Sequence, residues 1–226
     1  MIKGILKDDI QIQKDSTINV IVKNGQRKKY EPWLEEFFTF AYDWMMKNTV
    51  FPKRLSADFI KHSEINRDLL GEIRNKHILE LGTGSGRISR VLDKSNYYAG
   101  VDISRGLLKK AAKRFGKAGF PEYELFLASA DNLPFKEEQF DLVVCNLSLN
   151  FFPDIGQVIS EIRRTLNSNG QFFCSVPVPE RKRKEAVIHG TLYTEERLKT
   201  YFTEAGFRFN SLPYINGAIL YFIASY

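Results

Sequence analysis

From residue 77 to the end of the chain, short apolar runs alternate with stretches in which apolar residues recur every three or four positions. Uninterrupted apolar runs predict strands buried on both faces, whereas the three- and four-residue spacing predicts helices packed along one side. Strands are expected at residues 78–81, 97–102, 124–128, 140–145, 171–176, 207–212 and 218–225, and helices at 87–92, 104–116, 155–166 and 194–205. This alternation predicts an α/β fold: a doubly wound, mostly parallel, seven-stranded sheet with helices on both faces and an antiparallel edge.

The first 75 residues follow a different pattern. A strand is expected at residues 17–23, followed by a turn at Asn24-Gly25, and Pro32 suits the first turn of a helix. The apolar face of that helix is expected to comprise Trp33, Phe37, Phe40, Ala41 and Trp44. A second helix is expected at residues 56–70, ending at Gly71. We therefore divide the chain into a cap segment, residues 1–75, expected to serve as a substrate lid, and a main domain, residues 76–226.

A glycine-rich loop, residues 82–86, follows the first strand of the main domain and opens a helix. Glycine is required where φ is positive, or where a ligand approaches so closely that a side chain would collide with it. A helix start also presents unpaired backbone N–H groups to an anionic group. Asp102 ends the second strand, 20 residues after Gly82, where a βαβ unit brings its carboxylate beside the loop. Loop and carboxylate together predict a nucleoside pocket in which Asp102 accepts from both ribose hydroxyls; the alternative is a solvated aspartate at a strand end.

The spacing of the glycines argues against a dinucleotide ligand. Dinucleotide-binding loops carry glycine or alanine three positions after their second glycine. That position is Arg87 when the count starts at Gly82, and Ser89 when it starts at Gly84. NAD and FAD are therefore disfavoured.

Five blocks of sequence lie in order at fitting separations: residues 77–86, 100–104, 128–135, 140–146 with 151–154, and 161–166 with Gly170. In these blocks the chain resembles the class I S-adenosylmethionine-dependent methyltransferases, in particular the methyltransferase type 11 branch that includes ubiquinone and menaquinone methyltransferases. The resemblance covers residues 77–226. It implies a Rossmann-like methyltransferase fold with an N-terminal helical cap, S-adenosylmethionine as the cofactor, and methyl transfer that releases S-adenosylhomocysteine.

The resemblance also implies roles for matching positions. The methionine end of the cofactor is expected to contact Glu80, Gly82, Thr83, Gly84 and Gly86, with Asn146 beneath the sulfonium. The nucleoside is expected to contact Asp102 at the ribose and Ile103, Ala130, Asp131 and Leu133 around the adenine. Glu80 lies inside a strand, where a buried carboxylate without a partner is costly, so a cationic amine suits it. A structural role for Glu80 and an ordinary turn at Asp131 are the alternatives.

The sequence does not identify the methyl acceptor, nor the base that an oxygen or nitrogen acceptor requires. His189 is a candidate base because it follows the fifth strand, in a loop expected to face the site; an exposed loop histidine is the alternative. The basic run 181–184 in that loop suits an anionic substrate or membrane, or is merely solvated. The aromatic residues of the cap segment suit an aromatic acceptor or core packing. Residues 146–150 lack the proline-proline-aromatic pattern of methyltransferases that act on adenine amino groups or glutamine.

Composition adds a few limits. The 226 residues carry a formal net charge of +6, which is compatible with binding RNA, so a tRNA or other RNA methyltransferase stays as an alternative to a small-molecule methyltransferase. A non-catalytic cofactor-binding protein is a second alternative. DNA is not expected as a partner, no residues have metal-ligand spacing, and no run is long and apolar enough to span a membrane. Cys145 and Cys174 lie in apolar runs typical of buried reduced thiols, and we expect a cytoplasmic protein.

Overall fold

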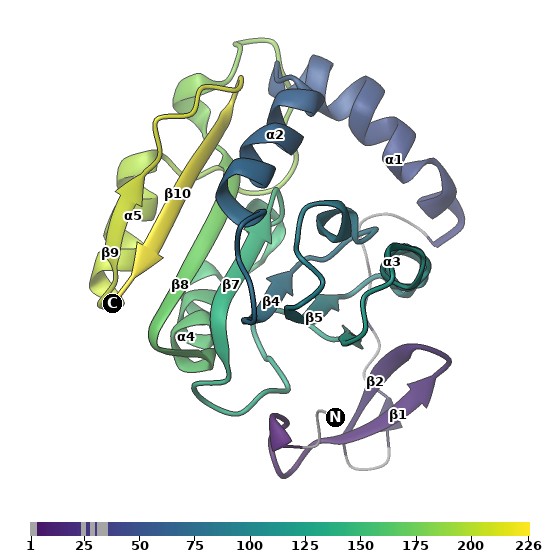
Figure 1. Ribbon diagram of the computed structural model, residues 1–226. Coiled ribbons are helices and arrows are strands. Elements are labelled where there is room, and N and C mark those ends of the chain that lie inside the picture. Colours follow the sequence, from purple (N-terminus) through teal and green to yellow (C-terminus); the bar gives the residue numbers. More distant parts are fainter. Residues whose placement is uncertain (1–3, 24–25, 28–29, 31–35) are drawn as a thin grey trace.

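The computed structural model describes residues 4–23, 26–27, 30 and 36–226, and these contain one ten-stranded sheet (Figure 1). The strands are β1 (Gln11–Asp15), β2 (Ile18–Lys23), β3 (Gln26–Arg27), β4 (His77–Leu81), β5 (Tyr97–Asp102), β6 (Tyr123–Leu127), β7 (Phe140–Asn146), β8 (Leu166–Pro177), β9 (Arg208–Ser211) and β10 (Ile219–Ser225). The α-helices are α1 (Tyr42–Met45), α2 (Phe59–Leu70), α3 (Arg105–Ala118), α4 (Ile155–Thr165) and α5 (Glu195–Glu204). Other helical turns are η2 (Glu36–Ala41), η3 (Met46–Leu55), η4 (Arg87–Arg90), η5 (Leu149–Phe151) and η6 (Pro179–Arg181).

The sheet has the strand order β1-β2-β6-β5-β4-β7-β8-β10-β9, with β3 paired to β2. The strands from β6 to β8 in this order are parallel, whereas β10 and β9 form the antiparallel edge. The predicted doubly wound sheet is therefore confirmed, but the predicted count of seven strands is too low. The reason is that β2 pairs in parallel with β6, joining Ile18 to Leu125, and β1 adds antiparallel to β2. A strand of the predicted cap segment thus extends the main sheet.

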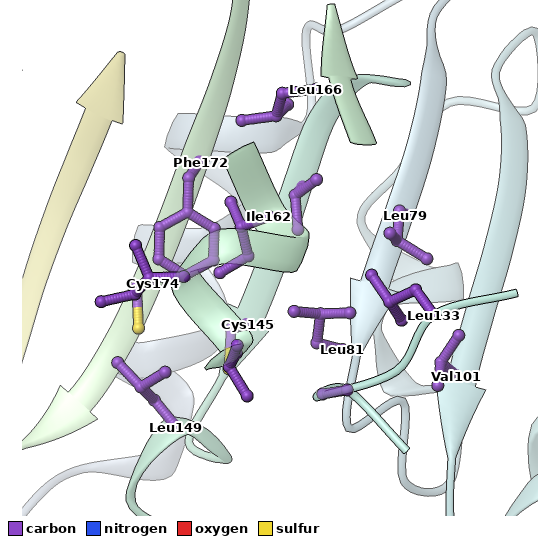
Figure 2. Packing of buried hydrophobic residues seen from close by; sticks show 14 of the residues in the cluster. Leu79, Leu81, Val101, Leu133, Cys145, Leu149, Ile162, Leu166, Phe172 and Cys174 are labelled. Atoms are coloured by element: carbon purple, nitrogen blue, oxygen red, sulfur yellow. The ribbon is translucent and has the colours of Figure 1, made fainter. Parts of the chain in front are cut away.

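Helices cover both faces of this sheet, each over its own layer of buried side chains. On one face, Ile162 of α4 packs in a cluster with Phe172 of β8, as Figure 2 shows. Cys145 and Cys174 lie in the same cluster as free, buried thiols. On the other face, Phe115 of α3 stacks on Tyr98 of β5, with ring centroids 4.2 Å apart. The carboxyl ends of β4, β5 and β7 therefore emerge between two packed helical layers, where a ligand can bind.

The helix boundaries follow from their caps. Ser104 accepts a hydrogen bond from Leu107 N at the start of α3, and Thr194 accepts from Arg197 N at the start of α5. The predicted end of α3 at Gly116 is wrong: the helix continues to Ala118 and is capped by Gly119, whose φ of +74° ends it. The helix predicted at residues 87–92 is also shorter than expected, being the four-residue 3₁₀ turn η4.

The leading helical segment, residues 36–55, combines η2, α1 and η3, the last a π-helix that contains Pro52. Its predicted apolar face is wrong where the structure describes it, because Phe40 and Trp44 are 71% and 66% exposed. Pro32 and Trp33, the side chain of Phe37, and the Asn24-Gly25 turn lie outside the described residues. In Figure 1 the segment passes along one side of the molecule above the strand ends. Among the described helices, none combines the length and apolarity that a bilayer span needs.

Candidate active site

The glycine loop is tied to the neighbouring strand by its own backbone. Gly82 N and Thr83 N both donate to Val101 O, at 2.9 and 3.0 Å, and Gly84 N donates to a carboxylate oxygen of Asp102 at 2.7 Å. These N–H groups are therefore already used within the protein. The loop therefore has fewer free amides than expected of a helix start, because η4 has only four residues and several loop amides bond within the protein. The loop instead allows a ligand to come close to its backbone.

The glycines are needed for that approach. Gly82 has φ +69°, and a Cβ there would overlap the side chain of Ser148, which follows β7. Gly84 has φ +55°, and its open side faces the hydroxyl of Tyr42. Gly86 has a different role: a Cβ on it would lie 2.7 Å from Ala111 Cα, so it packs the loop against α3. The loop consequently passes between α3 and the chain after β7 with space left above Gly82 and Gly84.

Asp102 stands at the end of β5 with its carboxylate fixed by the backbone. One oxygen accepts from Gly84 N at 2.7 Å and the other from Ser104 N at 2.8 Å. Burial raises the pKa of Asp102 above its usual value, while the backbone hydrogen bonds act against that rise. Each oxygen retains a lone pair for a further donor. The arrangement suits two neighbouring hydroxyls, as the ribose prediction requires.

Glu80 lies in β4 and is 4% exposed. Its carboxylate accepts a 2.5 Å hydrogen bond from the hydroxyl of Tyr98 and is also within hydrogen-bonding reach of Asn146. Burial raises the pKa of Glu80 to about 8, because it outweighs these two hydrogen bonds. Among the described residues, no lysine, arginine or histidine forms an ion pair with Glu80. The ionised carboxylate of Glu80 would therefore be stabilised by a cationic group of a ligand.

Two cavities meet at the glycine loop. The first has a volume of about 260 Å³ and is lined, among the predicted residues, by Gly82, Gly84, Asp102, Ile103, Ala130 and His189. The second has a volume of about 220 Å³ and is lined by Glu80, Gly82, Thr83, Gly84 and Asn146. Tyr42, Met46 and Leu147 line both cavities, so they adjoin beneath the leading helical segment.

Three predicted residues line neither cavity. Gly86 faces α3, and Leu133 is fully buried in the core. Asp131 lies beside the Ser129-Ala130 wall of the first cavity, and its Oδ1 is buried without a hydrogen-bond partner among the described residues. The adenine-binding roles of Asp131 and Leu133 stay predictions.

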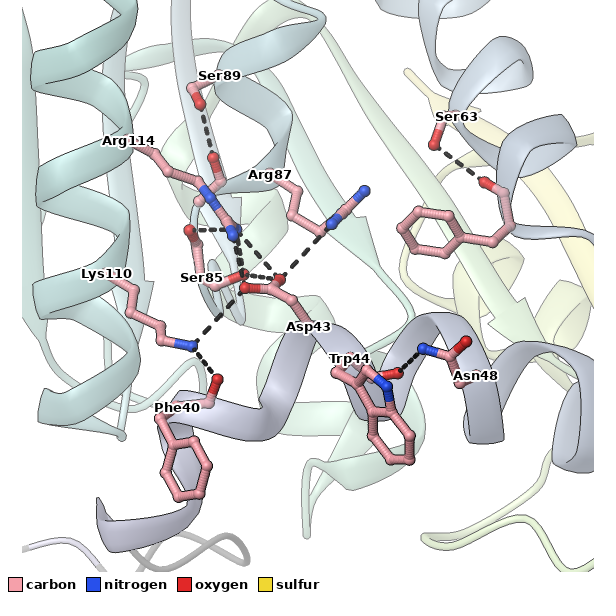
Figure 3. A network of polar contacts seen from close by, with 12 residues as sticks. Phe40, Asp43, Trp44, Asn48, Ser63, Ser85, Arg87, Ser89, Lys110 and Arg114 are labelled. Carbon is pink, nitrogen blue, oxygen red and sulfur yellow. Dashed lines mark hydrogen bonds and ion pairs between the residues drawn. The ribbon is translucent and has the colours of Figure 1, made fainter.

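One carboxylate, Asp43 of α1, fastens the leading helical segment to the glycine loop and α3 (Figure 3). Arg114 binds it through both terminal nitrogens, at 2.5 and 3.2 Å, and the Ser85 hydroxyl donates to it at 2.9 Å. Arg87 and Lys110 add ion pairs at 3.6 and 3.7 Å. Although burial opposes ionisation, the hydrogen bonds from Arg114 and Ser85 hold the pKa of Asp43 below its usual value. We call this group the Asp43 cluster.

The other end of the segment is fastened to the loop before β10. Leu55 O accepts from Ala218 N at 2.8 Å, and a side chain on Gly217 would overlap the Leu55 carbonyl. The Asn216 amide accepts from Asp58 N at 2.8 Å and donates to Asp58 O at 2.9 Å. The segment is thus held at both ends and forms a roof over the cavities, with inward-facing residues at four-residue spacing: Tyr42, Met46, Val50 and Arg54.

The structure separates the three histidines. His189 is exposed and lines the first cavity, and Asn150 Nδ2 donates to its backbone carbonyl at 2.7 Å, which fixes the loop there. His77 is exposed at the start of β4. His62 is buried, with Nε2 accepting from Asn66 and Nδ1 bonded to the Tyr221 hydroxyl. Burial lowers the pKa of His62 to about 3, so it is neutral with both nitrogens occupied and cannot act as a base.

The basic run 181–184 is only half available for ligands. Arg181 pairs with Glu195 at 3.2 Å and donates to Ile219 O, and the Lys182 ammonium donates to three nearby carbonyls. Arg183 and Lys184 are exposed. Within the described residues there is no group of three or more potential metal ligands.

Sequence reasoning missed Tyr98 and the Asp43 cluster, and it considered Tyr42 only as one of the aromatic residues of the cap segment. Tyr98 could have been suspected from the sheet register, because it pairs with Ile78, two residues before the buried Glu80 on the same strand. Asp43 gave no local signal, since it meets Arg114, 71 residues away in sequence.

The fold is of the doubly wound α/β class, and its two cavities lie at the carboxyl ends of the strands, where such sheets bind ligands. Residues 79–174 match the family described as methyltransferase domain. A demethylmenaquinone methyltransferase of Thermotoga maritima is 28% identical over 163 residues, covering 69% of this chain and 67% of that protein. The ubiquinone/menaquinone biosynthesis C-methyltransferase of Rickettsia felis is 33% identical over 108 residues, 44% of each chain. The chain spans 36 to 53% of the length of three other curated relatives.

Solved structures agree in fold. An S-adenosylmethionine-dependent methyltransferase of Aquifex aeolicus superposes with a TM-score of 0.63 at 12% identity, over 84% of this chain and 97% of that one. Over residues 79–174 the chain therefore resembles the class I S-adenosylmethionine-dependent methyltransferases, including those of ubiquinone and menaquinone biosynthesis, and this likeness implies S-adenosylmethionine as the cofactor. The residues fit this group: Glu80 lacks a cation among the described residues, Asp102 has acceptor capacity, and the backbone of Gly82 and Gly84 lines both cavities.

Proposed function

We propose that the protein transfers the methyl group of S-adenosylmethionine to a small-molecule acceptor. The observation that carries the proposal is the pair of cavities joined at the glycine loop, with Asp102 on one side and Glu80 on the other. A carboxylate on each side suits a ligand with hydroxyls at one end and an ammonium group at the other. The roof above both cavities suits an acceptor small enough to be enclosed.

When bound, S-adenosylmethionine supplies an electrophilic methyl group, and S-adenosylhomocysteine is the product. Asp102 would accept from the ribose hydroxyls, Glu80 would bind the ammonium group, and Ile103 with Ala130 would pack on the adenine. Asn146 lines the second cavity, where its side-chain oxygen accepts a hydrogen bond from the Ser175 hydroxyl at 3.0 Å. The roof excludes water from the reacting groups. Since the methyl donor is already activated, alignment is the main contribution of the protein, worth about 7–11 kcal/mol in favourable cases.

His189 is our candidate for the base that an oxygen or nitrogen acceptor would need. Its backbone is fixed by Asn150 at the rim of the first cavity, and its side chain is exposed there. General-base catalysis typically contributes about 10²–10⁴-fold, so His189→Gln should lower kcat by that factor if the acceptor must lose a proton. An acceptor that is already deprotonated when it binds would make the change nearly silent.

A small molecule is favoured over RNA by the position of the roof. The leading helical segment is fastened at both ends across the strand edge, and half of the basic run 181–184 is occupied by protein contacts. An RNA substrate would instead require an open basic groove and strongly salt-dependent binding. Binding of bulk tRNA that weakens steeply between low and moderate salt, together with methylation of that tRNA, would reverse this preference.

Calorimetry with S-adenosylhomocysteine tests the binding part of the proposal. Asp102→Ala should weaken binding by roughly 1–3 kcal/mol, because charge-assisted hydrogen bonds are lost. Asp68→Ala, at an exposed position of α2, is the matched control and should leave affinity unchanged. Incubation with methyl-labelled cofactor and a metabolite panel tests turnover. Tight binding without transfer to any metabolite or RNA would instead indicate a non-catalytic binding protein.

A further inference from the structure

The first cavity extends well beyond the part that faces Asp102. The roof crosses it lengthwise: Tyr42 lies near Asp102, and twelve positions later Arg54 lies next to Leu55, which is bonded to the loop before β10. Three strand spacings separate the end of β5 from the end of β8, where Pro177 lines the cavity. At about 4.8 Å for each spacing, the two ends lie on the order of 14 Å apart.

The walls of this far part are mainly apolar. They include Met46, Val50, Leu147, Phe152, Pro177 and Ile188. Arg54 is the charged exception at this end of the cavity. An apolar chamber that contains a single cation selects a ligand with an apolar body and one anionic group.

Arg54 lines the first cavity without a partner among the described residues, as Arg67 and Arg90 do at the second cavity. Arg87 and Arg114 pair with Asp43, and Arg181 pairs with Glu195. No hydrogen bond or ion pair within the described part of the chain involves the Arg54 side chain. Lys53, its neighbour in the last turn of the same helix, is exposed and lines neither cavity. A favourable interaction with the helix C-terminus would explain a cation at either position, but it does not explain why Arg54 lies at the cavity wall.

A half-buried guanidinium beside apolar walls binds a carboxylate strongly, because its planar fork makes two parallel hydrogen bonds and water competes less. We propose that the methyl acceptor is a small apolar carboxylic acid whose carboxylate binds Arg54, with its body against the apolar walls. Leu55, the neighbour of Arg54, is bonded to the loop before β10, and β10 lies two strand spacings, about 10 Å, from β7, which suits a single ring or a short chain. This inference rests on the proposed function, since it assigns the acceptor of that reaction.

The test begins with S-adenosylhomocysteine titrated into the wild type, Arg54→Met and Lys53→Met. All three proteins should bind it equally, which separates this test from that of the proposed function. Each protein, saturated with S-adenosylhomocysteine, is then titrated with three acid and amide pairs: benzoate and benzamide, 4-hydroxybenzoate and 4-hydroxybenzamide, octanoate and octanamide. In the wild type and Lys53→Met, at least one acid should bind about tenfold or more tightly than its amide. In Arg54→Met that preference should vanish.

Several results would overturn the assignment. Equal binding of acids and amides by the wild type, no binding of any acid to a protein that does bind S-adenosylhomocysteine, or equal losses in Arg54→Met and Lys53→Met would each do so. If Arg54→Met fails to fold, Arg54→Lys serves instead, because it keeps the charge but loses the planar fork; it should retain only part of the preference for the acid. A wild type that does not bind S-adenosylhomocysteine would contradict the proposed function itself.

Discussion

Below the cavities, the side chains that face a ligand stand at the ends of β4, β5 and β7, each a strand paired in parallel on both sides. Above them, the roof is a helical segment with no place in the sheet, and it is held by the Asp43 cluster at one end and by Asn216 and Gly217 at the other. The lower wall is therefore positioned by backbone hydrogen bonds, and the upper wall by a few side chains.

This difference separates the wall proposed to bind the cofactor from the wall proposed to bind the methyl acceptor. The lower wall contributes Glu80 and Asp102, the groups proposed to bind the cofactor, and these cannot shift without disturbing the sheet. The roof contributes Met46, Val50 and Arg54, which face the part of the cavity left for the acceptor. A scaffold that keeps its cofactor wall can accept another substrate when only the roof changes.

The largest effect is expected in the lower wall, from Gly82→Ala. A non-glycine residue at positive φ costs about 1–2 kcal/mol, and overlap with Ser148 adds about 1–3 kcal/mol. We expect roughly 2–5 kcal/mol lower stability by urea denaturation, together with loss of S-adenosylhomocysteine binding. Gly116→Ala, in α3, is the control: a Cβ there would meet the Tyr123 hydroxyl at an ordinary 3.6 Å, so the variant should be neutral or up to about 1 kcal/mol more stable. A Gly82→Ala protein as stable as the wild type would show that the loop is not constrained as described.

Asp43→Asn should loosen the roof while the sheet stays intact. It leaves Arg114 without its charged partner, and a part-buried pair of this kind is worth about 1–3 kcal/mol. Hydrogen exchange should rise in residues 42–55 but not in β4 or β7. Because the pKa of Asp43 is lowered in the folded protein, its stabilisation is present above the unfolded value of 3.8 and is lost as pH falls through the folded pKa. Asp68→Asn is the control; equal exchange rates in both variants would argue that the Asp43 cluster does not hold the roof.

The same contrast explains what could be predicted from the sequence. The lower wall was predictable because each part of it is local: an apolar run forms a strand, glycines form the loop, and an acidic residue ends the next strand. Glu80, Asp102 and Asn146 were accordingly placed at the cavities from sequence blocks alone. Even there, the hydrogen-bond partners of the loop N–H groups could not be predicted, because they depend on the length of η4.

The roof was not predictable, because its contacts join distant parts of the chain. Arg114 is 71 residues from Asp43, and Asn216 is 158 residues from Asp58. The apolar spacing that predicted a core-facing helix was misleading, since Phe40 and Trp44 are exposed and the cavity instead meets Tyr42 and Arg54. The pairing of β2 with β6 was hidden for the same reason: parallel pairing between strands about a hundred residues apart leaves no local sequence pattern.

Glu80 gives a pH dependence that belongs to the lower wall. Its pKa is raised to about 8 in the free protein, and an ammonium group favours the ionised form. Below pH 8, binding of S-adenosylhomocysteine must therefore release a proton, so affinity should rise with pH by up to about tenfold per unit and level off near pH 8. Calorimetry in buffers of different ionisation enthalpy measures that proton. Glu80→Gln should bind more weakly with no such slope, and an equally pH-independent wild type would contradict the assigned partner.

The smallest effect is expected at the basic run, which belongs to neither wall. Arg183 and Lys184 are exposed, so the double change to Gln should alter stability by less than about 0.5 kcal/mol and leave S-adenosylhomocysteine affinity unchanged. Arg181→Gln removes a pair with Glu195 and a hydrogen bond to Ile219 O, and should cost about 0.5–1.5 kcal/mol in urea denaturation. Arg181 would then matter because it holds the loop in place, and not because of its charge toward a ligand. If the double change at Arg183 and Lys184 instead lowered the turnover of a carboxylic acid acceptor as much as Arg54→Met does, the loop would be the part that attracts the carboxylate. The proposal that the roof selects the substrate would then be contradicted.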